Sequence, residues 1–324
     1  MISKAKPTEP ELDVVALPEG LETGFYRLRF GSIVLPVQYR RGTGNILLVI
    51  FHGAVDRSRN EIPKYERQLP GLDSCHQLSV ADPTLALHPE MVASWYLGAA
   101  EMPLEAEFPR LIAHLSARLG LRKLIYMGGS SGGFAALNFS LRDPGSVCIA
   151  VNPQTDLSKY HSNAAERQLL RVWPDASSLA EIGSRVTLDL PTAYAKGFDN
   201  LVIYLQSIGD LRHYGTQMPA FCEAGLKRPD RFILHCGYWG IPGHSGSIPG
   251  KAYSAWVKAV VTAPWLDRQA ILDAHHVLTA LPRQPDNGST PPSLVRPGHA
   301  MASPTDLRRS DLLREHILRQ SVEC

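Results

Sequence analysis

Apolar and polar residues alternate along this chain with two periods, one typical of strands and one typical of helices. Gly24–Phe30 and Ser32–Arg40 alternate on either side of Gly31, which predicts a hairpin of half-buried strands. Asn45–Phe51 is almost entirely apolar, as expected for a strand in the middle of a sheet that is covered on both faces. Five more short apolar segments are expected to be strands: Gln77–Ala81, Leu124–Met127, Val147–Val151, Leu201–Leu205 and Arg231–His235.

Segments with helical periodicity lie between several of these strands. Leu104–Leu119 repeats apolar residues at helical spacing and ends at Gly120. Phe134–Arg142 stops before Asp143-Pro144, because a residue that precedes proline disfavours the helical conformation. Ala252–Val261 is a further helical segment. Strands that alternate with helices predict an α/β fold with a mostly parallel sheet and helices on both faces.

One long segment interrupts this alternation inside the expected domain of residues 21–265. Residues 157–199 lie between two predicted strands, where a connection in an α/β unit usually has about 2–6 residues. Because the segment contains a helical stretch, Ala164–Val172, we expect it to form a small helical cap.

The two ends of the chain differ in composition from the central domain. Residues 1–20 are polar and contain proline, so we expect an N-terminal lead-in. In the C-terminal extension 266–324, residues 281–304 are rich in Pro, Ser, Gly and Asn and are expected to be a disordered linker. Leu307–Leu318 is expected to be a charged terminal helix, which would associate with itself, contact a protein or remain solvated.

Composition narrows the classes of protein that this chain can belong to. With a formal net charge of +2, the chain offers no general electrostatic attraction for nucleic acid or an anionic membrane. Its longest apolar runs fall short of the roughly 20 residues that cross a bilayer, and residues 1–10 lack the apolar core of a signal peptide. The five scattered cysteines indicate a reducing compartment and no metal motif. We therefore expect a cytoplasmic protein without a metal or cofactor.

The candidate chemistry begins with Gly128-Gly-Ser-Ser-Gly-Gly133, between a predicted strand and a predicted helix. Gly128–Gly132 fits G-x-S-x-G, the turn that lifts a nucleophilic serine above a sheet. Ser130 is the preferred nucleophile because only two residues separate it from Met127, the last apolar residue of the strand; Ser131 fits the same pattern one residue later. A glycine-rich turn can also bind phosphate, but the chain has no G-x-x-x-x-G-K-[ST] motif.

A serine nucleophile needs a base, and the base needs an acid that orients it. His244 lies in a glycine-rich loop after the last predicted strand and is the expected general base, whereas His235 lies within that strand and is expected to be structural. Asp210, after the preceding strand, is the expected acid, with Asp156 as its rival. His213 is expected at the rim of the site.

Other site residues are expected in the loops around this serine. The backbone N–H groups of Ala54, after Phe51-His-Gly, and of Ser131 are the expected oxyanion donors. Side chains that could contact substrate are His52, Gly53, Arg57, Arg59, Trp95 and Trp239. Arginines would favour a negatively charged polymer or a CoA phosphate, and tryptophans would stack on sugar rings, although solvated arginines and core tryptophans are the commoner alternatives.

Taken in order, Phe51-His-Gly-Ala54, Gly128–Gly133, the cap-length insertion, Asp210 and His244 resemble the α/β-hydrolase superfamily over roughly residues 24–261. The resemblance implies an eight-stranded, mostly parallel sheet and a Ser130–Asp210–His244 triad. Ser79-Val-Ala-Asp-Pro-Thr84, Ser94-Trp-Tyr-Leu-Gly98 and Gly128–Ala136 are more loosely similar to a bacterial group that includes capsule-polymer O-acetyltransferases.

These observations leave three functions open. The first is a serine-dependent ester hydrolase that works through an acyl-enzyme. The second is an O-acetyltransferase that uses acetyl-CoA as co-substrate and a bacterial surface or capsular polysaccharide as acceptor. The third is a catalytically silent scaffold that binds a partner. A complete set of Ser130, Asp210 and His244 argues against the third.

Overall fold

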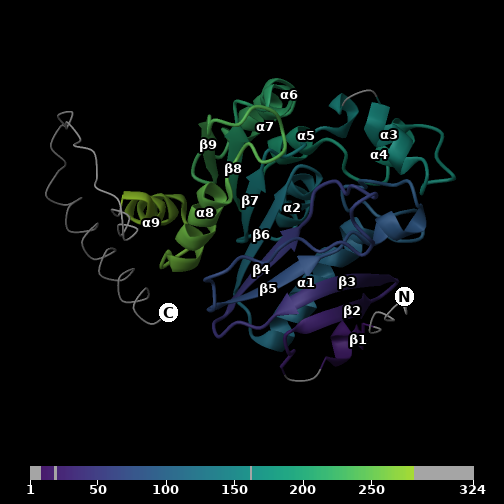
Figure 1. Cartoon of the computed structure of the whole chain (residues 1–324), viewed down its shortest axis with the longest axis horizontal. Coiled ribbons are helices and arrows are strands. Elements are labelled where there is room, and N and C mark those ends of the chain that lie inside the picture. Colours follow the sequence, from purple (N-terminus) through teal and green to yellow (C-terminus); the bar gives the residue numbers. More distant parts are fainter. Residues whose placement is uncertain (1–8, 18–19, 161–162, 281–324) are drawn as a thin grey trace, which may run out of the picture.

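The computed structural model describes residues 9–17, 20–160 and 163–280, which are built around one nine-stranded sheet (Figure 1). The order across the sheet is β1-β2-β3-β5-β4-β6-β7-β8-β9. Strand β3 pairs antiparallel with β2 and β5, and all other neighbours are parallel. The strands are β1 (Glu11–Asp13), β2 (Gly24–Phe30), β3 (Ile33–Arg40), β4 (Ile46–Phe51), β5 (Cys75–Val80), β6 (Lys123–Gly129), β7 (Val147–Val151), β8 (Leu201–Ser207) and β9 (Phe232–Gly237).

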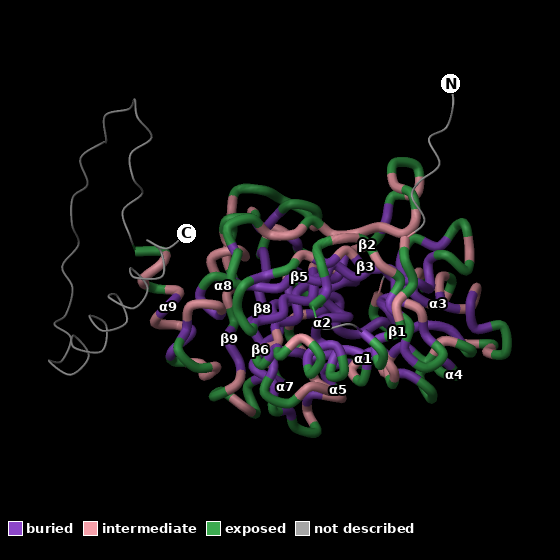
Figure 2. The backbone as a smooth tube through the Cα atoms, turned by 90° about the horizontal axis from the view of Figure 1, so that it is seen from below, coloured by how far each residue is buried: buried purple, intermediate pink, exposed green. Residues whose placement is uncertain are grey.

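Helices cover both faces of the sheet, which confirms the predicted α/β class. Leu47, Val49 and Phe51 of β4 point into a core shared with α1 (Leu104–Leu119), α2 (Ser131–Leu141), α5 (Leu190–Ala195) and α7 (Met218–Gly225). Ile46, Leu48 and Ile50 of the same strand point to the opposite core, which is shared with α8 (Gly250–Thr262) and α9 (Arg268–Ala280). The uninterrupted apolar run therefore follows from burial on two sides, and Figure 2 shows the strands buried at the centre.

The expected cap segment is helical. Between β7 and β8 the chain forms η3 (Leu157–Lys159), α3 (Ala164–Leu169), α4 (Leu179–Gly183) and then α5. Tyr194 of α5 is fully buried in the core that α5 shares with α1, α2 and α7, so this last helix is part of the helical layer that covers the sheet. Helices α3 and α4 project on the side of the molecule opposite α9 (Figure 1).

The two ends of the described chain add elements that the sequence patterns did not predict. β1 pairs in parallel with β2, so the sheet has nine strands rather than eight, and part of the expected lead-in belongs to it. A 3₁₀ turn follows (η1, Val14–Ala16) and buries Val14. At the other end, α9 lies within the expected extension and buries Ile271 in the same core as α8.

The expected linker 281–304 and terminal helix Leu307–Leu318 lie outside the described residues. Within the described ranges, no helix combines the length and the apolar character needed to cross a membrane.

Candidate active site

Ser130 occupies a strained turn between β6 and α2. Its backbone has φ 57° and ψ −121°. Residues other than glycine rarely adopt this backbone conformation, and they keep it only where the surrounding structure imposes it. Gly132 permits the turn, because a Cβ there would lie 2.5 Å from the carbonyl oxygen of Phe51 and 2.6 Å from that of His52. The glycines therefore let α2 begin directly against the end of β4, with Ser130 at the junction.

Replacing Gly132 should test how tightly this turn is packed. We expect Gly132→Ala to lower the free energy of unfolding by about 1–3 kcal/mol, since neither backbone carbonyl can move without displacing β4. Gly215→Ala is the matched control: Gly215 lies in α6 (Leu211–Thr216), and a Cβ there would meet no atom within 4 Å. The control should be neutral or up to about 1 kcal/mol more stable. Urea denaturation of both variants measures the difference, and equal stabilities would contradict this account of the turn.

The loop after β4 lies beside Ser130. A Cβ on Gly53 would lie 3.6 Å from the Cβ of Ser130. The backbone N–H groups of Ala54 and Ser131 donate no hydrogen bond to any described residue. Two donors without a partner among the described residues, one directly after the serine and one in the neighbouring loop, are the groups that an oxyanion site requires.

His52 holds this loop from inside the protein. Its backbone N–H donates to the hydroxyl of Tyr96 at 3.0 Å, and its Nε2 accepts the N–H of Asp82 at 3.1 Å. Burial lowers the pKa of His52, which fits a neutral ring that accepts a hydrogen bond there. His52 is buried, so it fixes the loop and does not offer its side chain to a substrate.

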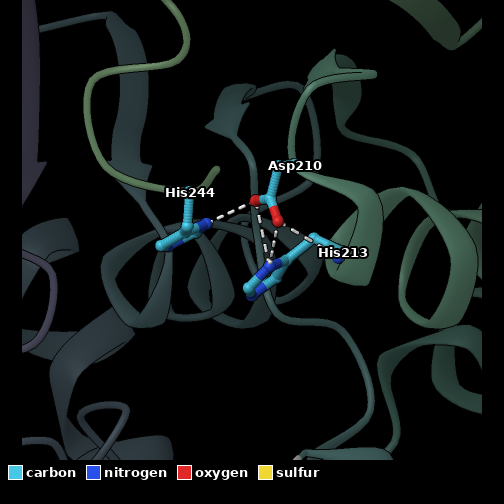
Figure 3. Close-up of side chains that lie close together, drawn as sticks. All are labelled: Asp210, His213 and His244. Carbon is cyan, nitrogen blue, oxygen red and sulfur yellow. Dashed lines mark hydrogen bonds and ion pairs between the residues drawn. The ribbon is translucent and has the colours of Figure 1, made fainter. Parts of the chain in front are cut away.

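Asp210 caps the N-terminus of α6, just beyond β8, and binds two histidines (Figure 3). One carboxylate oxygen accepts from Nδ1 of His213 at 3.0 Å, and the other accepts from Nδ1 of His244. Burial alone would raise the pKa of Asp210, but the hydrogen bonds from the two histidines outweigh it and hold the pKa well below its usual range. Asp210 is therefore a carboxylate in the folded protein.

The two imidazole rings stack on one another. The ring centroids of His213 and His244 are 4.1 Å apart, with 17° between the planes. The side chain of His244 is 33% exposed, whereas that of His213 is only 5% exposed. His213 therefore belongs to the interior of the cluster and not to its rim, where the sequence placed it.

Gln154 joins the serine to the histidine cluster. Its side-chain Nε2 lies 2.9 Å from Ser130 Oγ and 3.2 Å from Nε2 of His213. Among the described residues, no direct hydrogen bond joins Ser130 to His244. Sequence reasoning missed Gln154, although it lies just beyond β7, the strand beside β6, where a polar side chain reaches the same end of the sheet.

Comparison with known proteins bears on the fold. No protein family model matches the sequence, and no curated protein is significantly similar to it. The capsule O-acetyltransferase of Neisseria meningitidis serogroup A is 15% identical with a TM-score of 0.54, over 75% of this chain and 96% of that one. An acylaminoacyl peptidase of Pyrococcus horikoshii is 16% identical with a TM-score of 0.53, over 78% of this chain and 44% of that one. The chain has the α/β-hydrolase fold. It spans less than half of the peptidase.

Within this α/β-hydrolase fold, the other expected site residues lie as follows. Asp156 caps η3 and pairs with Lys159 at 2.9 Å. His235 accepts from the indole of Trp256 at 2.8 Å, consistent with the expected structural role. The remaining three candidate substrate-binding residues, Arg57, Arg59 and Trp239, occupy surface or half-buried positions. Arg57 donates to the carbonyl of Leu85 at 3.3 Å, and the exposed Arg59 pairs with Asp56 at 3.4 Å. The half-buried Trp239 packs on His235, with ring centroids 5.5 Å apart.

Trp95 lies in the core and not on a binding surface. It is 1% exposed, and its indole N–H donates to Oε1 of Gln154 at 2.7 Å. Its ring faces are therefore unavailable to a sugar, and its contact with the site runs through Gln154.

The Asp210, His213 and His244 side chains also form a set whose ligand atoms lie within 4.8 Å of one another, close enough to be compatible with a metal ion. Both Nδ1 atoms already face the carboxylate, so these three side chains are complete as a hydrogen-bonded cluster and we assign no metal to them. We expect incubation with EDTA followed by gel filtration to leave the rate of hydrolysis of p-nitrophenyl acetate unchanged. A loss that added Zn²⁺ restores would overturn this assignment.

Proposed function

We propose that this protein is a serine-dependent ester hydrolase that works through an acyl-enzyme, with Ser130 as nucleophile, His244 as general base and Asp210 as the acid that orients it. The observation that carries the proposal is the backbone of Ser130, held at φ 57° between β6 and α2. Strain of this kind is retained where a reacting group must be presented. The ionised, buried Asp210 beside two histidines supports it.

The proposed reaction has two halves. Ser130 Oγ attacks the carbonyl carbon of the ester while its proton passes to Nε2 of His244, and Asp210 stabilises the imidazolium through the Nδ1–H. The N–H groups of Ala54 and Ser131 stabilise the oxyanion. As the tetrahedral intermediate collapses, the imidazolium gives its proton to the leaving alcohol, which leaves the acyl group on Ser130. A water molecule, deprotonated by His244, then attacks the acyl-enzyme and releases the carboxylic acid and Ser130.

Covalent labelling tests this proposal directly. A fluorophosphonate probe phosphonylates an activated serine and releases fluoride, so we expect one label per wild-type molecule. Peptide mass spectrometry should locate the label on the peptide that contains Ser130, and fragmentation should place it on that residue. Protein denatured in urea before the probe is added is the control and should not react. A native protein that remains unlabelled would contradict the proposal.

The second candidate is an acetyl-CoA-dependent O-acetyltransferase acting on a bacterial surface or capsular polysaccharide. It is favoured by the match over 96% of the capsule O-acetyltransferase chain. In this reaction the same serine would take the acetyl group from acetyl-CoA, releasing CoA thiol, and a sugar hydroxyl would replace water as acceptor. Arg59, with a side chain 83% exposed, is available to a CoA phosphate if it leaves Asp56.

Thiol release separates the two candidates. The protein is incubated with acetyl-CoA alone and with a panel of capsular polysaccharides, and free CoA is measured with a thiol reagent. A transferase releases CoA faster with one acceptor, and the polymer gains acetyl groups. A hydrolase turns over p-nitrophenyl acetate with no effect of any polymer.

A further inference from the structure

The proposed reaction leaves one buried set of contacts unused, namely the line from Trp95 through Gln154 to Ser130 and His213. We propose that Gln154 is a positioning residue whose side chain is held in place by Trp95. Gln154 orients the hydroxyl of Ser130 and occupies Nε2 of His213, so that His244 is left to act as the base. This inference rests on the proposed serine chemistry.

The orientation of the Gln154 amide follows from Trp95. An indole N–H can only donate, so the Gln154 atom that it contacts at 2.7 Å must be the carbonyl oxygen. The amide nitrogen then faces the opposite way, toward Ser130. Both side chains are almost fully buried, at 1% and 2% exposed, so water does not compete for these contacts.

The backbone around Trp95 is strained. Trp95 and Tyr96 both have positive φ, 53° and 57°, which is unfavourable for bulky residues. Buried Asp82 holds this turn by accepting from the backbone N–H of Tyr96 at 3.1 Å and from the hydroxyl of Ser94. Strain that is maintained by a buried carboxylate beside an active site indicates a functional constraint on where the indole points.

The Gln154 nitrogen carries two hydrogens and has two acceptors. One hydrogen is donated to Ser130 Oγ at 2.9 Å, and the other to Nε2 of His213 at 3.2 Å. An Nε2 that accepts carries no hydrogen, so the ring proton of His213 is on Nδ1, where the carboxylate of Asp210 accepts it at 3.0 Å. The contacts of both ring nitrogens therefore indicate the same tautomer of His213, with the hydrogen on Nδ1.

This arrangement distinguishes the two histidines that share Asp210. Nε2 of His213 is occupied by Gln154, whereas Nε2 of His244 has no hydrogen-bond partner among the described residues. Ser130 Oγ accepts from Gln154 and so keeps its own hydrogen to donate. The lone pair left open for that hydrogen is on His244, and stacked His213 supports the ring of that base.

An isosteric substitution separates positioning from packing. Gln154→Glu keeps the shape of the side chain and the acceptor for Trp95, but it replaces the donor to Ser130 by an oxygen that accepts. We expect Gln154→Glu and Gln154→Ala to lower the rate constant of fluorophosphonate labelling by about tenfold to a hundredfold, since a misplaced nucleophile costs that much. With p-nitrophenyl acetate the loss should fall on kcat, with KM within about twofold.

The matched control is Gln77→Ala. Gln77 is equally buried and bonds only backbone groups through its side chain, at Leu69, so its loss should reduce stability without changing the labelling rate. Trp95→Phe removes the indole N–H together with part of the buried ring system and should lower the rate severalfold. Combined with Gln154→Ala it should cause no further loss, because Trp95 acts through Gln154. Additive losses, or a Gln154→Glu variant that labels as fast as the wild type, would overturn the inference.

A spectroscopic measurement keeps this inference separate from the proposed function. In protein labelled with ¹⁵N-histidine, we expect wild-type His213 to carry its hydrogen on Nδ1, and Gln154→Ala to shift the Nε2 resonance of His213 by removing its donor. An unshifted resonance would refute the Gln154 contact whether or not the protein is an enzyme. A wild type that shows the expected resonances but is never labelled would refute the serine chemistry alone.

Discussion

Ser130→Ala should abolish labelling by a fluorophosphonate and lower kcat for p-nitrophenyl acetate by at least about 10⁴-fold, to the background of residual binding and oxyanion stabilisation. The reason is geometric, since Ser130 occupies the strained position at which β6 meets α2. The measurement is the intact mass of the protein after reaction, together with the initial rate of p-nitrophenol release.

Ser131→Ala is the matched control for this prediction. Ser131 begins α2 and is buried, and its proposed contribution is a backbone N–H, which alanine retains. We therefore expect its labelling rate to remain within about threefold of the wild type, as for other changes that leave the reacting groups in place. If Ser131→Ala were the variant that failed to react, the alternative assignment of the nucleophile to Ser131 would be correct.

His244→Ala should lower kcat by about 10³–10⁴-fold, whereas His213→Ala should lower it by only about tenfold, since the second variant loses a neighbour of the base and not the base itself. The difference follows from Nε2 of His244, which has no partner in the part of the chain that the structure describes, and Nε2 of His213, which is occupied by Gln154. Steady-state rates of p-nitrophenyl acetate hydrolysis at several pH values measure both effects.

His213→Gln and His244→Gln keep a polar side chain at each position and serve as paired controls for loss of packing. Asp210, whose pKa is held low by both histidines, keeps one of the two as a hydrogen-bond partner in each of these variants. Urea denaturation must show that each variant is folded under the assay conditions. A larger loss for His213→Ala than for His244→Ala would assign the base to His213 and require Gln154 to move away during the reaction.

The local features of this fold could be predicted from the sequence. The apolar run of β4 and the turn at Ser130 depend on neighbours within a few residues, so their patterns can be recognised directly. β1 could not be found in this way, because Glu11-Leu-Asp13 is mostly polar and becomes a strand through pairing with β2. Helix α9 was missed because its apolar residues are interrupted by a histidine pair and its role is to pack on α8.

The site residues show the same difference between local patterns, which the sequence reveals, and contacts between distant residues, which it does not. Ser130, Asp210 and His244 were selected by the order in which they follow their strands. The close contact of Asp210 with His244 agrees with that choice, while their catalytic roles stay predictions. Gln154 and Trp95 act through contacts between residues 59 positions apart in the chain, and no local motif marks such a pair. His213 was misplaced because a residue in the first turn of α6 can face solvent or the core, and only the packed structure decides which.

The order of the strands has a consequence for the protein during its synthesis. β4 pairs with β5, the next strand in the chain, on one side, and on its other side with β6, which is followed directly by Ser130. Asp210 and His244 follow β8 and β9, which leave the ribosome after all the other strands of the described sheet. A nascent chain therefore exposes its serine well before it contains the base, and on the proposed mechanism it cannot react with cellular esters or thioesters until the loop after β9 has been synthesised.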